Sequence, residues 1–304
     1  MPSRTCYFFV LLIGLFCSAR RHEIRAEVPL LSCQNSAKDS AQNSAKNHEI
    51  RGYDFSDKAV QVFDLPKDLT EASGLAFTED SRLFAHNDEA GMIFEIDPQT
   101  GRMLRKFYLG RPMLRGDFEG LAAKKDTLFL TNSSGTIFRF CAGADGQQIT
   151  YDTFKTALHV RNDVEGLAYD PDTDGLLLAC KGDAGTGRRD QKAVYSFSLK
   201  TYKLEAKPRF VLPLSEILTQ TGRKEFNPSG LERHPGSGNF FLIAFNGFAI
   251  VEIDPQGKIL GVSNLPKSVH NQPEGLAIAK DGAIYIANEG QGKSGKLAVY
   301  RPQK

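Results

Sequence analysis

The sequence has no tryptophan, little methionine and almost no net charge, and these shortages narrow the class of protein. Without tryptophan, the chain is not built from repeats that a Trp-Asp pair defines. The formal net charge of +2 argues against a nucleic-acid binder, which carries a basic surface against the phosphates. The abundant residues are 28 glycines and 21 phenylalanines, which indicate many tight turns between short strands.

The N-terminal hydrophobic run is too short for a typical transmembrane helix. Residues 5–19 are uncharged and follow Arg4. A membrane span needs about 20 apolar residues, whereas this length suits the apolar region of a signal peptide. Small residues suit cleavage after Ala19 or after Ala26. We therefore predict a signal peptide at residues 1–19 and an extracytoplasmic protein, which is periplasmic, secreted or membrane-associated.

Two features leave alternatives to a cleaved signal. Arg20 and Arg21 follow the apolar run directly, and positive charge there hinders export. The segment could then be retained as a membrane anchor; otherwise the mature chain has no transmembrane helix. The third alternative is lipidation at Cys33, which ends a Leu-Leu-Ser-Cys box.

Residues 20–58 are predicted to form a flexible tether. The five residues 34–38 recur as 42–46, and this stretch is rich in Ser, Ala, Asn, Lys and Gln. Such a composition buries too little apolar area to offset the entropy of ordering. The folded domain is therefore assigned to residues 59–304, where 30 basic residues balance 30 acidic ones.

The cysteines do not form a disulfide framework. Outside the signal peptide they are Cys33, Cys141 and Cys180, which is an odd number. Cys180 lies in an apolar run and is predicted to be a small core residue, although a bridge from Cys141 to Cys180 is another option.

A repeat organises the rest of the chain. Ser or Glu followed by Gly-Leu occurs five times, and the successive glycines are 46, 46, 64 and 45 residues apart. The copies begin at Ser73, Glu119, Glu165, Ser229 and Glu274. A period of about 40–50 residues with strand-like content is typical of β-propeller blades. The 64-residue interval is one period plus 18 residues, too few for another blade, and a short helix is expected near residues 215–218.

We predict an all-β fold, a single propeller of five four-stranded blades. The hairpin at residues 93–101 recurs at residues 250–257, with Asp-Pro opening the turn and Gly closing it. The last repeat is one strand short, whereas residues 59–63 form a strand with no preceding partner. The N-terminal strand is therefore expected to complete the last blade and close the ring. Six blades would require an unrecognised blade in the long interval.

The repeat predicts a polar site at one mouth of the central channel. Three carboxylates should converge there, those of Glu119, Glu165 and Glu274. Four of the second strands are followed by amides, those of Asn87, Asn132, Asn246 and Asn288. Carboxylate and amide oxygens are hard ligands that suit Ca²⁺, and crowded carboxylates repel one another unless a cation neutralises them. The alternative is a structural network in which the Glu side chains accept backbone hydrogen bonds or pair with arginines.

The loops that lead into the inner strands supply candidate ligand-binding residues. These are Asp117, Asp163, Arg115 and Arg161, and Asp88, which follows a second strand on the same face, is a further candidate. His86 and His270 are weak candidates for a general base in hydrolysis, and solvent-exposed loop histidines are the plainer interpretation. The sequence has no Gly-x-Ser-x-Gly nucleophile motif, so no catalytic residue is identified.

Three segments carry a family resemblance. Residues 71–75, 117–121 and 163–167, together with the hairpin at 93–101, resemble the SdiA-regulated, YjiK-like family. That resemblance covers about residues 58–304 and implies an extracytoplasmic or membrane-associated bacterial β-propeller. The Glu-Gly pairs and the Asn residues are more distantly similar to the calcium-dependent lactonase and phosphotriesterase propellers. The esterase-like phytase propellers share the Asp-x-Glu-Gly-Leu pattern, which implies hydrolysis as an option.

Three functions follow from these patterns. The first is an exported or envelope-associated propeller that binds a small molecule or a protein or envelope partner, with Ca²⁺ at the channel mouth. The second is a Ca²⁺-dependent hydrolase of lactones or phosphoesters, and the third is a non-catalytic scaffold. We expect a monomer that binds no nucleic acid.

Overall fold

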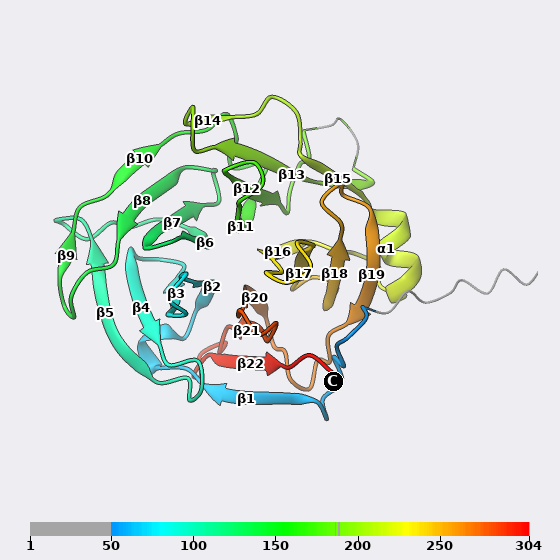
Figure 1. The fold of residues 1–304 in the computed structure, drawn as a ribbon, viewed down its shortest axis with the longest axis horizontal. Helices are drawn as coiled ribbons and strands as arrows, with labels where there is room; N and C mark the ends of the chain where they lie inside the picture. The colour runs from blue at the N-terminus through cyan, green and yellow to red at the C-terminus, as the bar shows by residue number, and fades with distance from the viewer. Residues whose placement is uncertain (1–49, 186, 188, 304) are drawn as a thin grey trace, which may run out of the picture. The chain divides into compact units, whose positions relative to one another are not determined.

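Five β-sheets are arranged around a central axis, like the blades of a propeller (Figure 1). The structure is a computed structural model, and it describes residues 50–185, 187 and 189–303. Each sheet runs outward from an inner strand, and the inner strands of neighbouring blades contact one another around the ring. The predicted five-bladed propeller is confirmed.

The blades follow one another along the chain. Blade 1 contains β2 (Ala72–Phe77), β3 (Leu83–Asn87), β4 (Met92–Ile96) and β5 (Met103–Leu109). Blade 2 contains β6 (Phe118–Lys124), β7 (Thr127–Asn132), β8 (Ile137–Cys141) and β10 (Asp152–Phe154), while β9 (Gln148–Ile149) pairs in parallel with β5. Blade 3 contains β11 (Val164–Asp170), β12 (Gly175–Cys180), β13 (Gln191–Ser198), β14 (Lys203–Leu204) and β15 (Phe210–Pro213). Blade 4 contains β16 (Pro228–Arg233), β17 (Phe240–Ala244), β18 (Ala249–Ile253) and β19 (Ile259–Asn264). Blade 5 contains β20 (Pro273–Ile278), β21 (Ile284–Asn288), β22 (Lys296–Tyr300) and β1 (Val60–Asp64).

The ring closes as the repeat predicts. β1 is the outer strand of blade 5 and pairs antiparallel with β22, with Val60 opposite Tyr300 and Asp64 opposite Lys296. Figure 1 shows this first strand lying beside the last strand of the chain. Blade 5 therefore combines the two ends of the folded unit, which leaves no gap in the ring.

The extra residues of the 64-residue interval lie in blade 3 and after it. β13 pairs with both β14 and β15, and α1 (Leu214–Thr221) follows β15 directly. The helix ends at Gly222, whose φ of +65° is a left-handed conformation that glycine adopts without strain. On the outside of the ring, α1 contacts β19 of blade 4 (Figure 1).

The core lies between blades as well as within them. Leu75, Phe94, Tyr285 and Val299 belong to one buried cluster that joins blade 1 to blade 5. β12 and β21 are buried along their whole length, because neighbouring blades cover both faces of each sheet. This packing explains why these two second strands are continuous apolar runs and not alternating ones.

Residues 50–58 belong to the folded unit, although their neighbours led us to assign them to the tether. Ile50 and Phe55 are buried, and the Phe55 ring packs 5.0 Å from that of Tyr300. The Tyr53 hydroxyl donates a hydrogen bond to the Gly282 carbonyl at 2.6 Å. These three apolar or aromatic residues provide the burial that the preceding Ser- and Asn-rich stretch lacks. The predicted signal peptide and Cys33 lie outside the described residues.

Two further findings concern the cysteines and membrane-spanning helices. Cys180 is buried in the core as predicted, and Cys141 and Cys180 are both free thiols. None of the helices in the described part of the chain is long and apolar enough to cross a membrane.

Candidate functional site

A β-bulge sits at the repeat position in every blade. The pairing of the inner strand with the second strand shifts register at Ser73, Glu119, Glu165, Ser229 and Glu274. A bulge inserts one extra residue and redirects its side chain. In each blade, the Ser or Glu of the repeat is therefore the extra residue of the inner strand, with no residue opposite it in the second strand.

The glycine after the bulge is needed for close approach of neighbouring blades. A Cβ atom at Gly120 would lie 2.8 Å from the backbone nitrogen of Leu167 in blade 3. At Gly230, a Cβ atom would lie 2.6 Å from the carbonyl oxygen of Glu274 in blade 5. Both distances are too short for a side chain, so close approach of the neighbouring blade requires glycine at these positions of the repeat.

The three predicted glutamates gather where the inner strands begin. The Ser73 hydroxyl lies 3.3 Å from Oε2 of Glu119 and 3.5 Å from Oε2 of Glu274. Glu165 and Glu274 are buried. We call Glu119, Glu165 and Glu274 the carboxylate cluster, and it joins residues of blades 2, 3 and 5.

Burial is the main influence on the proton affinity of the carboxylate cluster. It raises the pKa of Glu119, and the charges of Glu165 and Asp117 raise that pKa further. Burial also raises the pKa of Glu274, with repulsion from Glu289 adding to the effect. The pKa of Glu165 is raised less, because the Lys181 ammonium opposes the cost of burial. The folded protein therefore holds protons at these carboxyls at pH values where an exposed glutamate has lost its own.

Lys181 is the site residue that the sequence pattern did not identify. Its Nζ lies 2.6 Å from Oε1 of Glu165 and 3.8 Å from Oδ2 of Asp163. Burial acts to lower the pKa of Lys181, but attraction to Glu165 outweighs it and raises the pKa to about 12. The available signal was positional, since Lys181 directly follows the second strand of blade 3, one residue beyond the position at which blades 1, 2 and 5 have Asn.

The predicted asparagines are bonded within their own loops. Asn87 Oδ1 accepts the Ala90 N–H at 3.2 Å, and Asn132 Oδ1 accepts the Thr136 N–H at 2.9 Å. The Asn288 amide is buried and donates to the Ile286 carbonyl at 3.2 Å. Asn246 contributes its backbone carbonyl, which accepts the Asn227 N–H at 3.0 Å. The structure therefore brings the three glutamates together without bringing these four amides to them.

The loops leading into the inner strands interlock with those leaving the second strands. The Asp117 carbonyl accepts the Ser133 N–H at 3.0 Å, and the Asp163 carbonyl accepts the Lys181 N–H at 2.7 Å. Asp88 accepts the Phe118 N–H at 2.7 Å through its own carbonyl. Burial, and then Glu71, raise the pKa of the Asp88 carboxyl to about 6. These backbone bonds hold the acidic loops next to the carboxylate cluster.

The predicted arginines do not pair with the cluster. Arg115 and Arg161 are exposed, and neither lies within 4 Å of a carboxylate among the residues that the structure describes. The alternative of a structural network has arginines pairing with the glutamates. In the structure, it is Lys181 that pairs with Glu165.

The two histidine candidates are buried. Burial lowers the pKa of both His86 and His270 to about 4, so both rings are neutral at pH 7. His270 Nδ1 donates to Asn288 Oδ1 at 2.9 Å, and its Nε2 accepts the Tyr300 hydroxyl at 2.8 Å. His86 Nδ1 donates to the Asn87 carbonyl at 2.9 Å. Both nitrogens of His270 are thus occupied, and the buried His86 ring is not presented to a substrate at the surface.

The donor chemistry of the cluster suits Ca²⁺, but the raised pKa values of Glu119 and Glu274 favour their protonated forms, and Glu165 already pairs with Lys181. Carboxylate oxygens are the ligands that calcium prefers. The described residues contain no group of three or more His, Cys, Asp or Glu side chains already placed to hold a metal ion. A calcium ion would have to displace protons from Glu119 and Glu274 and the Lys181 ammonium from Glu165.

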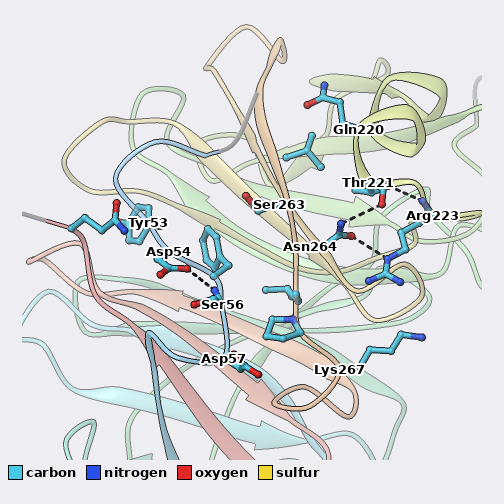
Figure 2. A pocket seen from close by; sticks show the side chains of 15 residues that line it. Tyr53, Asp54, Ser56, Asp57, Gln220, Thr221, Arg223, Ser263, Asn264 and Lys267 are labelled. Atoms are coloured by element: carbon cyan, nitrogen blue, oxygen red, sulfur yellow. Dashed lines mark hydrogen bonds between the residues drawn. The ribbon is translucent and has the colours of Figure 1, made fainter. Parts of the chain in front are cut away.

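A separate pocket lies away from this cluster. It has a volume of about 660 Å³ and is lined by residues 53–57, the end of α1 and the end of β19 (Figure 2). None of the sequence-predicted site residues lines this pocket.

The fold and the repeated bulges define the class of this protein as a five-bladed β-propeller with acidic residues at the start of its inner strands. A model of the SdiA-regulated family matches residues 59–291, and the chain belongs to this family. A search of curated proteins finds no match.

Solved structures show the same fold at low sequence identity. A glutaminyl cyclase from Myxococcus xanthus is 16% identical with a TM-score of 0.52, covering 80% of this chain and 94% of its own. A luciferin-regenerating enzyme is 12% identical with a TM-score of 0.50, covering 80% of this chain and 95% of its own. These similarities describe the fold and do not assign a reaction.

Proposed function

We propose that the protein is an exported or envelope-associated propeller that binds a small molecule or a partner through its carboxylate cluster, with Ca²⁺ as the cation. The observation that carries this proposal is the convergence of three glutamates from three blades, two of them buried, next to the Lys181 ammonium. Like charges in a buried position are costly, and a bound cation offsets that cost.

Calcium binding is proposed to exchange one set of positive charges for another. Glu119 and Glu274 would lose protons, and Glu165 would release Lys181 to bind the ion. The freed Lys181 ammonium would then interact with an anionic group of a ligand. This exchange makes the affinity for calcium rise with pH, because the metal competes with protons for the same oxygens.

A thermal-shift titration with calcium chloride tests the proposal. We expect the melting temperature to rise with calcium for the wild-type protein, since a ligand that binds only the folded state stabilises it. The Glu119→Gln/Glu165→Gln double variant should not respond, whereas Glu205→Gln, which removes an exposed carboxylate, should respond like wild type. An unchanged response in the double variant would place calcium elsewhere, and no response in wild type would remove calcium from the proposal.

The hydrolase alternative has a separate test. Buried carboxyls with raised pKa values are candidates for proton transfer, whereas His86 and His270 are not exposed for that role. Turnover of a lactone or an aryl phosphoester that requires calcium, and that Glu274→Gln abolishes, would establish hydrolysis. Absence of turnover with bound calcium would leave the binding function.

Export is proposed from residues 1–19, which lie outside the described residues. Cell fractionation and N-terminal sequencing of the full-length protein test it. A mature chain starting at residue 20 or 27 supports a cleaved signal, whereas an intact N-terminus in the membrane fraction supports a retained anchor.

A further inference from the structure

The pocket beside the end of α1 contains an arginine that hydrogen bonds hold in position. Arg223 Nε donates a hydrogen bond to Asn264 Oδ1 at 3.0 Å, and Asn264 Nδ2 donates to the Thr221 carbonyl at 3.2 Å. The backbone N–H of Arg223 also donates to the Thr221 hydroxyl at 3.2 Å. Figure 2 shows these bonds linking the end of α1 to the end of β19. The guanidinium is thus fixed through one edge.

The other edge of this guanidinium is available. Among the described residues, no carboxylate lies within 4 Å of Arg223, and only its Nε takes part in a side-chain hydrogen bond. An arginine offers two parallel N–H donors to a planar carboxylate, and less entropy is lost when the fork is already oriented. Arg223 therefore has the geometry of an anion-binding residue, with Asn264 as its positioning residue.

Lys267 adds positive charge at the same end of the pocket. Figure 2 shows its side chain extending on the same side as Arg223. Its Nζ lies 4.5 Å from the centre of the Phe248 ring, which favours the cation without neutralising it. Within the described part of the chain, Lys267 has no carboxylate partner within 4 Å. Two cations without acidic partners therefore share one end of the pocket.

The rest of the pocket restricts which anions fit. Its apolar lining comes from Pro266 and from the exposed edges of Phe55 and Val262, and its volume of about 660 Å³ is large enough for a small molecule. Asp54 and Asp57 also line the pocket, with Asp54 across from Arg223 (Figure 2). They repel a second negative charge, which disfavours polyanions and phosphates relative to a single carboxylate.

We propose that this pocket binds a small organic carboxylate with an apolar body, its carboxylate held by Arg223 and Lys267. The apolar body packs against the Phe55 and Pro266 side of the pocket. This site is separate from the carboxylate cluster and does not depend on calcium. Asn264 contributes by orienting Arg223 and does not contact the ligand through the oxygen that Arg223 already uses.

Calorimetric titration of the full-length protein with 4-phenylbutyrate tests the proposal. We expect Arg223→Gln to weaken binding about tenfold or more, because the charge-assisted pair is lost. Lys267→Gln should weaken binding by about threefold, as an exposed charge contributes less. Lys200→Gln, which removes an exposed lysine outside the pocket, should bind like wild type. A thermal melt of each variant checks that it is folded.

A double-mutant cycle separates positioning from stability. Asn264→Ala should weaken binding in the wild-type background but have no further effect in the Arg223→Gln background. An equal loss in both backgrounds would overturn the positioning role. The Glu119→Gln/Glu165→Gln double variant should bind the probe normally, which keeps this test independent of the calcium proposal.

Three results would overturn the proposal. The first is the absence of a heat of binding when the wild-type protein is titrated with millimolar probe. The second is an affinity for the probe that is unchanged in Arg223→Gln. The third is tighter binding of phenyl phosphate than of 4-phenylbutyrate, since the acidic side of the pocket is inferred to select the singly charged group.

Discussion

Single residues in the carboxylate cluster couple stability to pH. Glu119 and Glu274 bind protons more tightly in the folded chain than in the unfolded chain, because burial raises the pKa of each. A group of this kind makes the free energy of unfolding fall as pH rises above the ordinary glutamate value. Lys181 acts in the same sense but at higher pH, because its raised pKa keeps the ammonium charged in the folded chain across the neutral range and the stabilisation is lost only in strongly alkaline solution.

Replacing Glu119 with glutamine is expected to stabilise the protein at alkaline pH. The substitution removes a carboxylate that must ionise in a buried position, so the gain should be absent near pH 4 and grow toward pH 9. We expect a gain on the order of 1–3 kcal/mol in urea denaturation at pH 9. Glu205→Gln, an exposed control, should follow wild type at each pH. A gain that is constant with pH would contradict the account.

Replacing Lys181 with methionine is expected to destabilise the protein most at high pH. Glu165 would then be buried without its ammonium partner, which is 2.6 Å away in the structure. We expect a loss of about 1–3 kcal/mol at pH 8 and a smaller loss at pH 5, where the carboxyls are protonated. Lys181→Arg should retain most of the stability in the same denaturation series. An equal loss for methionine at both pH values would show that packing, and not charge, is what Lys181 contributes.

At the scale of elements, the inner strand of each blade carries both the packing and the site. The bulge directs the Ser or Glu out of regular pairing, and the following glycine allows the next blade to approach. The repeat in the sequence therefore encodes the same bulge and glycine in all five blades. Three copies have Glu where the other two have Ser, and these three glutamates form the carboxylate cluster.

A methyl group at the repeated glycine is expected to disturb two blades together. Gly120→Ala would place a Cβ atom 2.7 Å from the Leu167 Cβ and 2.8 Å from its backbone nitrogen. We expect a loss of about 1–3 kcal/mol, because strand backbones must move apart. Gly146→Ala is the matched control, since a Cβ atom there meets nothing within 4 Å and only its φ of +70° opposes the change. A smaller loss at Gly120 than at Gly146 would contradict the role of close approach.

The elements were more predictable from the sequence than the contacts of the site. Turn chemistry, such as the Asp-Pro to Gly hairpins, is local, so the strands around residues 93–101 and 250–257 lie where the pattern predicts. The positions of Glu119, Glu165 and Glu274 follow from the repeat in the same way. The partners of these residues depend on loop conformations that no period describes. Asn132 therefore bonds its own turn, and Lys181 takes the neutralising role expected of Arg115 or Arg161.

At the scale of the whole molecule, the ring is held closed by residues from both ends of the folded unit. β1 completes blade 5, and residues 50–58 add the contacts of Ile50, Tyr53 and Phe55. The net charge near zero is distributed unevenly over this ring. Acidic residues gather at the start of the inner strands, while Arg223 and Lys267 share a pocket at the outer edge.

Shortening the chain from its N-terminus should reveal where the folded unit begins. A chain that starts at residue 50 is expected to unfold at the same temperature as the full-length protein. A chain that starts at residue 65 loses β1 and the buried Phe55, so blade 5 keeps three strands and an open edge. We expect it to melt several degrees lower or to aggregate. Equal melting temperatures for all three chains would show that closure by β1 does not stabilise the ring.

The central claim, that the carboxylate cluster exchanges protons for a calcium ion, is tested most directly by calorimetry at controlled pH. Titrations of the full-length protein with calcium chloride in two buffers of different ionisation enthalpy report the number of protons released on binding. We predict binding that strengthens between pH 6 and pH 8, proton release at both values, and loss of both signals in the Glu119→Gln/Glu165→Gln double variant. Calcium binding without proton release, or no binding at either pH, would contradict the account.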